Sequence, residues 1–213
     1  MHPGDYHERT GPPQHDPPLN PEEKTRRLLR WLRFARPAHR EESIRKAYDE
    51  TFEWIFDEDV NQHTDSPSLV AWLKSGDGVY WIKGKPGSGK STLMKMVAVD
   101  ARTQQALSEW NASSKPILSS YYFWTQADSL ENSDVGLVRS ILCDLLNGRP
   151  ELCNDAFPDW EPKHAAYERT YVYVFAALKR LVASPNLKDR VCVVIVGLDE
   201  YARDSMRERT LSR

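Results

Sequence analysis

The strongest chemical pattern in the sequence is a glycine-rich stretch that fits G-x-x-x-x-G-K-[ST]. Glycines in such a stretch allow the backbone to curl, so that successive amide N–H groups point inward and a following helix adds the positive end of its dipole. This arrangement suits a phosphate group. The pattern predicts a phosphate-binding loop formed by Gly84, Lys85, Pro86, Gly87, Ser88, Gly89, Lys90, Ser91 and Thr92.

Two side chains of this loop have predicted roles. The Lys90 ammonium would reach the β and γ phosphates of a nucleoside triphosphate, and the Ser91 hydroxyl would be a ligand of Mg²⁺. ATP or GTP, together with Mg²⁺, are therefore the expected cofactors. The alternative is a glycine-rich turn with a solvated lysine, but the apolar segments on both sides of the loop favour the phosphate site.

A second group of chemical interest follows the apolar run at 191–196, where the sequence reads Gly-Leu-Asp-Glu-Tyr. Phosphoryl transfer needs acidic side chains near the end of a sheet strand, where they hold the magnesium shell and orient the attacking water. We expect Asp199 and Glu200 to be catalytic and Asp199 to share the metal with Ser91. Acidic residues also commonly cap a following helix, which is the alternative interpretation.

Alternating strands and helices would position these residues. The β-branched and aromatic run at 79–82 predicts a strand before the loop, and a helix after the loop is expected to continue to about residue 111. Further strands are predicted at 117–124 and 191–196, and further helices at 135–146 and 171–183. The alternation indicates an α/β fold, a three-layer domain with a parallel sheet.

The chain before the loop divides into two parts. Residues 1–20 form a proline-rich tail that we expect to be disordered, and residues 21–65 form a helical lead-in to a domain at 66–213. Asn20-Pro21 predicts the start of a helix that reaches about residue 35, and the apolar stripe at 41–56 predicts a second helix. Ser66-Pro67 is expected to cap a short helix that Gly76 ends.

The first of these helices is basic and amphipathic, with arginines at 26, 27, 30 and 33. We expect it to pack by its apolar face and leave its arginines in solvent. The alternative is a surface that binds an acidic partner, phosphate or a membrane.

Composition narrows the class of protein. The 213 residues carry a formal net charge of -2, so no overall field indicates nucleic acid or membrane binding. The three cysteines show neither zinc spacing nor an even disulfide framework, which favours a reduced compartment. An apolar signal segment or a membrane-spanning run is not apparent, so a cytoplasmic protein is expected.

Taken together, these segments resemble the N-terminal part of fungal NACHT-type NTPases of the STAND class, described as nephrocystin-3-like. The resemblance extends from about residue 32 to residue 201. It rests on the loop and on the segments TFEWIF at 51–56, WLKSGDG at 72–78, YFW at 122–124, GLVRSIL at 136–142 and GLDEY at 197–201.

The resemblance implies a three-layer P-loop NTPase fold whose nucleotide state controls opening and oligomerisation in signalling. It implies ATP or GTP as the nucleotide and a homo- or hetero-oligomer with full-length NACHT relatives as the assembly. A guanine-selecting Asn-Lys-x-Asp motif is not present, so ATP is modestly preferred.

Two departures from the family pattern limit the expected activity. Val196 stands where the family has an aspartate that holds magnesium through its water shell. The chain ends at Arg213, shortly after the Walker B strand, whereas the family inserts a further strand between the Walker A and Walker B strands. We therefore expect a truncated, marginally stable domain that binds nucleotide with weak or lost hydrolysis. The alternatives are an active NTPase switch and a non-enzymatic fragment that interacts through the basic helix.

Overall fold

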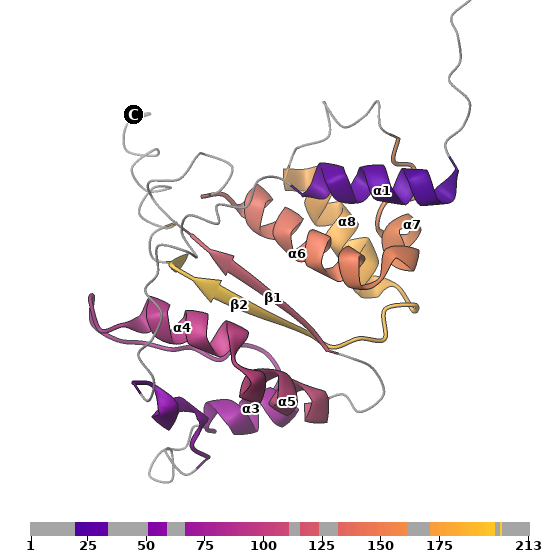
Figure 1. Ribbon diagram of the computed structural model, residues 1–213. Coiled ribbons are helices and arrows are strands. Elements are labelled where there is room, and N and C mark those ends of the chain that lie inside the picture. The colour runs from indigo at the N-terminus through magenta and orange to yellow at the C-terminus, as the bar shows by residue number, and fades with distance from the viewer. Residues whose placement is uncertain are drawn as a thin grey trace, which may run out of the picture.

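The computed structural model describes residues 20–33, 51–58, 67–110, 116–123, 132–161, 171–198 and 201. Within these residues the chain is mixed α/β, with seven α-helices, two short 3₁₀ helices and a parallel sheet of two strands (Figure 1). Several predictions lie outside the described residues. They are the tail before residue 20, most of the helix at 41–56, the strand end at Trp124, and Asp199 and Glu200.

The two strands of the sheet are β1 (Ile117–Tyr122) and β2 (Val191–Val196). They pair in parallel along their whole length, from Ile117 opposite Val191 to Tyr122 opposite Val196. β-Branched residues dominate β2, and β-branched or aromatic residues make up half of β1, as expected for a pleated surface with packed neighbours. The predicted strands are confirmed, with β1 ending at Tyr122. Coverage on both faces of β2 is incomplete, because Ile195 is 37% exposed.

One side of the sheet is covered by α6 (Asp134–Gly148), which lies against β1 (Figure 1). The helices α1 (Pro21–Leu32) and α8 (Tyr171–Ala183) pack on α6, and α7 (Cys153–Ala156) follows the short η2 (Pro150–Leu152). We call their shared core the α6 cluster. Its buried residues include Leu28, Trp31, Leu32, Leu142, Cys143, Leu146, Cys153, Val174, Ala177 and Leu181.

The start of α1 is as the sequence predicts. The Asn20 side chain accepts a hydrogen bond from the Glu23 backbone N–H at 2.8 Å, and Pro21 occupies the first helical position. The helix ends at Leu32, a few residues earlier than expected, and it buries Leu28, Trp31 and Leu32. Its apolar face therefore belongs to the core of the domain.

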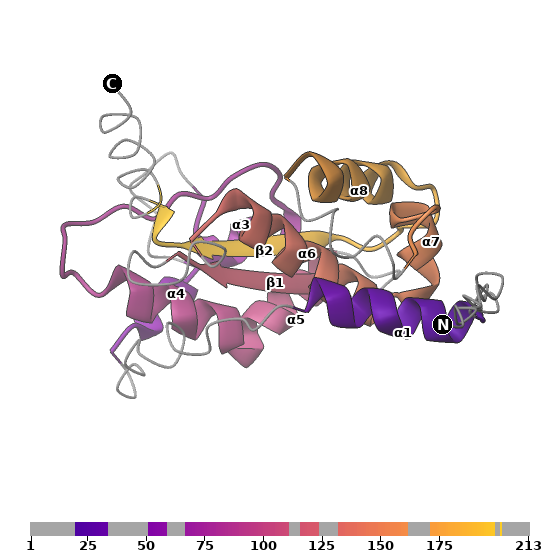
Figure 2. The ribbon, with the colours of Figure 1, turned by 90° about the horizontal axis from the view of Figure 1, so that it is seen from above.

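The other side of the sheet carries η1 (Glu53–Phe56), α3 (Leu69–Ser75), α4 (Lys90–Val99) and α5 (Ala101–Trp110). Figure 2 shows α4 and α5 in succession along this side. We call their shared core the α4 cluster, and its buried residues include Ile55, Leu69, Leu73, Leu93, Val97, Leu107 and Cys192. The cap of α3 differs from the prediction, because the Ser68 hydroxyl accepts from the Ala71 N–H at 3.2 Å.

The prediction of a strand at 79–82 is wrong. Tyr80 and Ile82 pack against the α4 cluster, whereas Val79 and Trp81 are 82% and 58% exposed. This alternation is that of an extended chain with one packed face. Among the described residues no strand pairs with it, since the two-stranded sheet contains only β1 and β2. Local sequence specifies extended backbone, but a strand also requires a neighbour that supplies hydrogen bonds.

The prediction of a single helix after the loop is also wrong, because the helix is interrupted at Asp100. The backbone of Asp100 is extended (φ -71°, ψ 138°), which ends α4. Its carboxylate accepts from the Arg102 N–H at 2.8 Å, as a capping aspartate does at the start of a helix. Asp100 therefore separates α4 from α5 and caps the second helix.

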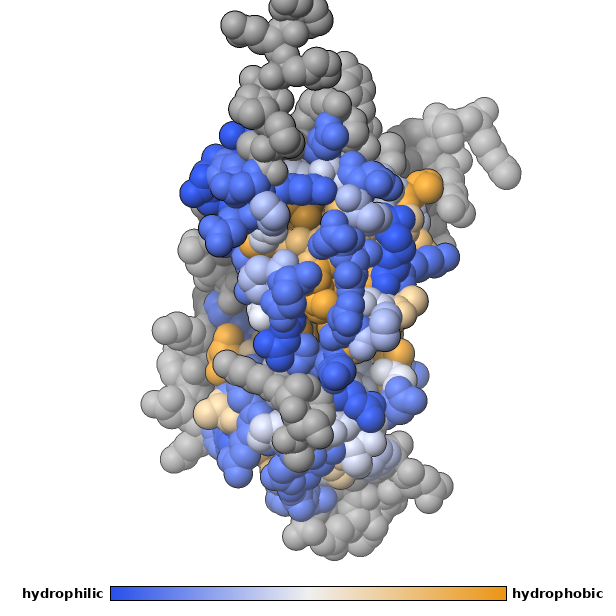
Figure 3. Space-filling view, turned by 90° about the vertical axis from the view of Figure 1, so that its right-hand side faces the viewer, coloured by the Kyte–Doolittle hydropathy of each residue, from blue (hydrophilic) through white to orange (hydrophobic). Residues whose placement is uncertain are grey.

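The surface near the start of α1 is mostly hydrophilic. Figure 3 shows apolar residues there only as narrow strips between hydrophilic ones. No helix in the described segments has both the length and the apolar character needed to span a membrane.

Candidate phosphate-binding site

The loop at 84–89 lies at the end of the molecule toward which both strands point. Figures 1 and 2 show the arrowheads of β1 and β2 directed to the side where this loop turns into α4. Ligands of open α/β sheets bind beyond the carboxyl ends of the strands. The loop therefore occupies the position at which such sheets place a ligand.

Two glycines give the loop its curvature. Gly87 and Gly89 have left-handed backbones, with φ values of 75° and 85°. Between them the Ser88 N–H donates to the Lys85 carbonyl at 3.2 Å, which closes a tight turn. Residues with a Cβ rarely adopt such backbones, so the glycine spacing of the motif corresponds to a conformational requirement.

The start of α4 offers backbone donors. Gly89 precedes the helix without a side-chain cap, and the first intrahelical bond runs from the Leu93 N–H to the Gly89 carbonyl at 2.9 Å. The N–H groups of Lys90, Ser91 and Thr92 therefore precede the helical ladder. Together with the helix dipole, such groups attract an anion.

The Lys90 ammonium is folded over the loop. It donates to the carbonyl oxygens of Gly84 at 2.9 Å and of Lys85 at 3.0 Å. The positive charge is thus held within the curve of the loop by two neutral acceptors. A phosphate oxygen is a stronger acceptor for the same ammonium, since hydrogen bonds between ionised groups are shorter and stronger.

Sequence reasoning missed the contact between the loop and Phe52. A Cβ placed on Gly89 would lie 2.9 Å from the Phe52 ring, so this ring packs directly against the loop. Phe52 precedes η1 and packs with the α4 cluster. The apolar stripe at 41–56 indicated packing, but no local signal identified its neighbour.

An ion-pair network joins η1 to the far end of α4. The Arg102 guanidinium bonds the Asp100 carboxylate at 2.8 and 3.0 Å and also bonds both oxygens of Glu53. It lies 4.0 Å from the centre of the Phe56 ring.

Hydrogen bonds from Arg102 lower the pKa of Asp100 and Glu53, and these carboxylates raise the pKa of Arg102. We call this set the Arg102 clamp. Together with Phe52 it ties η1 to both ends of α4.

The end of β2 carries no carboxylate. Val196 is only 5% exposed and shares an apolar cluster with Tyr122 and with Met94 and Ala98 of α4. At Val196, where the resemblance implies a magnesium-holding aspartate, the side chain is therefore apolar and packs against α4, the helix that follows the loop. Within the described residues no three His, Cys, Asp or Glu side chains come together as a metal site.

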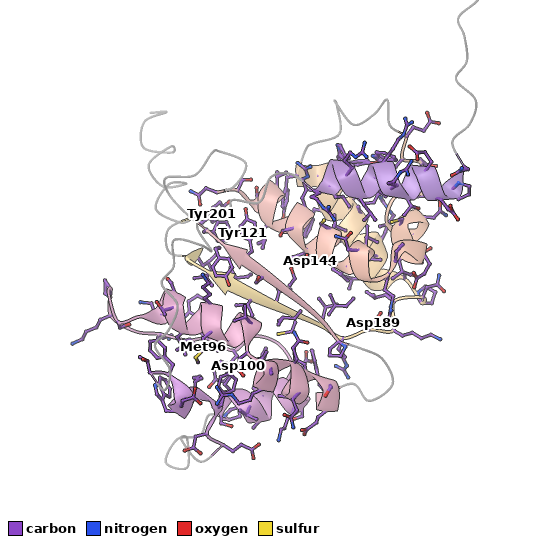
Figure 4. All side chains as sticks on the ribbon, viewed as in Figure 1. Met96, Asp100, Tyr121, Asp144, Asp189 and Tyr201 are labelled. Carbon is purple, nitrogen blue, oxygen red and sulfur yellow. The ribbon has the colours of Figure 1, made fainter. Side chains whose placement is uncertain are left out.

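Aromatic rings gather at the carboxyl ends of the strands, which the sequence did not indicate. Phe123 lies 5.0 Å from Tyr121 and 5.0 Å from Tyr201, measured between ring centres, and Figure 4 shows the two tyrosines close together. Gly197 turns the chain there with φ 78°, and a Cβ on it would lie 2.8 Å from the Phe123 carbonyl oxygen. A residue with a side chain would not fit this approach.

Comparison with known proteins gives one match. A family model described as "Nephrocystin 3, N-terminal" matches residues 50–213, a range that contains η1, the loop, α4 and both strands. No curated protein and no solved structure matches the chain.

Proposed function

Because the chain belongs to the nephrocystin-3 N-terminal family, we propose that it is a NACHT-like nucleotide-binding module that takes ATP or GTP with Mg²⁺. Residues 84–92 hold the phosphates in this proposal, and the Ser91 hydroxyl is a ligand of the metal. The wider fold is that of a three-layer P-loop NTPase. The resemblance to fungal NACHT-type NTPases of the STAND class supports this assignment.

The observation that carries the proposal is the geometry of the loop. Left-handed backbones at Gly87 and Gly89 curl the chain, three helix N–H groups follow it, and the Lys90 ammonium lies over the loop. These are the groups that a triphosphate requires, namely backbone donors, a cation and the positive end of a helix.

Weak or lost hydrolysis is the second part of the proposal. Val196 contributes an apolar contact to α4 where a magnesium-holding carboxylate would be needed. Loss of one preorganised electrostatic group lowers turnover by on the order of a hundredfold or more. The alternative is an active ATPase or GTPase switch, in which Asp199 and Glu200 supply the missing charge.

Two further expectations belong to this proposal. The cytoplasm is the proposed compartment, and the three free, buried cysteines support a reducing environment. Assembly with full-length NACHT relatives is the proposed route by which nucleotide binding takes effect.

Titration calorimetry of the full chain with ATP and with GTP, each with Mg²⁺, tests binding. The Lys90→Ala variant should lose most of the affinity, because it removes the cation that contacts the phosphates. Lys179→Ala is the matched control, since this exposed lysine of α8 lies on the other side of the sheet. Equal affinity in wild type and Lys90→Ala would refute the proposal.

Phosphate release from the full chain tests the second part. Wild type should turn over slowly, and Val196→Asp should be faster by about a hundredfold if the variant remains folded. Thermal unfolding with and without Mg²⁺ checks this condition, because the new carboxylate replaces a buried apolar group. Brisk and equal turnover in both proteins would favour the active switch.

A further inference from the structure

A groove runs along one side of α1, next to the stripe that this helix buries. Its volume is about 620 Å³, and its walls come from α1, from Asn147 near the end of α6, and from Pro150 and Glu151 of η2. The contributing residues of α1 recur at steps of one and three, which places them on one helical face. A volume of this size is typical of ligand pockets, which range over roughly 300–1,000 Å³.

The groove has an apolar, preformed patch between its two charged ends. Leu29 is half-buried there and packs against the α6 cluster, while Pro21 and Pro150 add apolar rings next to Glu22 and Glu151. Asn147 is held by a hydrogen bond from its amide to the Cys143 sulfur at 3.3 Å. A ligand would therefore meet a surface that the core of the domain already holds in place.

One end of the groove is cationic. Arg30 and Arg33 line it and are exposed, and within the described residues neither forms an ion pair. Arg26 also lines the groove, but its guanidinium is paired with Glu23. Two arginines about one turn apart are thus available for acidic groups of a ligand.

The other end of the groove is anionic. Glu22 lies in the first turn of α1, and Glu151 lies in η2, two residues before Cys153, whose thiol is hydrogen-bonded by Thr25. Neither glutamate forms an ion pair with a described residue. From Glu22 to Arg30 is about 12 Å along the helix axis, at about 1.5 Å per residue. The charge of the groove therefore reverses over this distance.

We propose that the groove binds an extended segment of a partner protein, with acidic residues at one end, a basic residue at the other end and an apolar residue between them. An extended chain advances about 3.3 Å per residue, so roughly four residues span the two charged ends. A nucleic acid or an anionic membrane presents negative charge throughout and would be repelled by Glu22 and Glu151. This surface is independent of the phosphate-binding loop.

Fluorescence anisotropy with labelled synthetic peptides tests the proposal. The probe carries two glutamates, a central leucine between alanines, and two lysines. The control peptide has the same composition with its charges interspersed. The probe should bind the full chain more tightly than the control, and its affinity should fall as salt concentration rises, because the charges involved are exposed.

Charge reversal locates the binding surface. The double variant Arg30→Glu and Arg33→Glu should weaken probe binding by about tenfold or more, since two pairs are lost and replaced by repulsion. The double variant Arg27→Glu and Lys179→Glu makes the same change in net charge outside the groove and should bind the probe as wild type does. Equal weakening by both variants would overturn the proposal.

Reversal of the other end gives a second, independent readout. Glu22→Lys with Glu151→Lys should weaken the mixed-charge probe and strengthen binding of an all-glutamate peptide of the same length. Failure of the mixed-charge probe to bind would overturn the proposal. The proposal would also be overturned if wild type bound phosphatidylserine vesicles or duplex DNA more tightly than the probe, in a manner that depends on Arg30. Circular dichroism checks that each variant is folded.

Discussion

At Gly89 the chain has a left-handed backbone directly before the first residue of α4, and the Phe52 ring lies against the open side of this glycine. Gly87 has a similar φ value of 75°, but no atom lies within 4 Å of the position of its missing Cβ. The two glycines therefore share a conformational requirement and differ in their surroundings. Because of this difference, the energetic effect of the Phe52 contact can be measured separately from that of the left-handed backbone.

Alanine at either glycine should lower the free energy of unfolding by about 1–2 kcal/mol through backbone strain. Gly89→Ala should cost more than Gly87→Ala, because its methyl group also meets the Phe52 ring. Urea unfolding of both variants measures the difference. In a Phe52→Ala background the two losses should become similar, and equal losses in the wild-type background would show that Phe52 imposes no constraint on the loop.

At the scale of elements, two charged contacts hold segments that are distant in sequence. The Arg102 clamp joins η1 to the junction of α4 and α5. On the other side of the sheet, Arg149 at the end of α6 bonds both oxygens of Asp189, just before β2, at 2.7 Å each. The first contact is largely exposed, whereas the Asp189 side chain is only 3% exposed.

The Arg102 clamp should make stability depend on pH. Arg102 lowers the pKa of Asp100 and Glu53, so the folded chain binds protons less readily than the unfolded chain. Their contribution is present above the unfolded pKa of about 4 and is lost as pH falls through the lowered values. Arg102→Ala should therefore reduce stability at neutral pH.

Thermal unfolding of wild type and Arg102→Ala from neutral to acidic pH checks this prediction. The gap between the two proteins should close as the carboxylates become protonated. A gap that stays constant over the whole range would mean that Arg102 acts through its contact with the Phe56 ring and not through the carboxylates.

Loss of the Arg149 guanidinium should destabilise the fold because it leaves a nearly buried Asp189 carboxylate with fewer partners. We expect Arg149→Ala to cost about 1–3 kcal/mol, less than for a fully buried pair because Arg149 is 35% exposed. Arg149→Lys should recover only part of this, since lysine cannot make the two parallel bonds. Denaturant unfolding provides the measurement, and a loss below about 0.5 kcal/mol in the alanine variant would argue against a structural role.

At the scale of the whole molecule, the α6 cluster and the α4 cluster lie on opposite sides of a sheet of only two strands. The strands contribute to both sides. Ile117 and Val191 pack against the α6 cluster, whereas Leu118 and Cys192 belong with the α4 cluster. Because neighbouring residues of the same strands serve both clusters, we expect the two to unfold together.

Thiol labelling follows the two clusters separately. Cys143 and Cys153 lie in the α6 cluster and Cys192 lies in the α4 cluster, and burial raises the pKa of Cys153 and Cys192 to about 11. All three thiols should be unreactive in the native protein at neutral pH. In variants that keep one cysteine each, labelling should appear at the same urea concentration. Earlier labelling of Cys192 alone would show that the α4 cluster opens independently.

Features that depend on local pattern were determined by the sequence. The cap and first turn of α1, the extents of α8 and β2, and the glycine spacing of the loop were all predicted and match the structure. The hydrophobic periodicity of a helix or strand can be recognised within a single segment of sequence. The requirement for glycine at a left-handed position depends only on the local backbone. The catalytic assignment of Asp199 and Glu200 stays a prediction.

Features that require a neighbour were decided only by the tertiary structure. Residues 79–82 are extended as their pattern indicates, yet they form no strand within the described chain, because strand pairing depends on a second segment. Phe52 meets Gly89, and Glu53 meets Arg102 across 49 residues, through contacts that no periodicity encodes. The groove along α1 likewise exists only because η2 and the end of α6 stand beside that helix. Sequence alone specified the glycine-rich loop at 84–92, and the packing of distant segments decided what surrounds it.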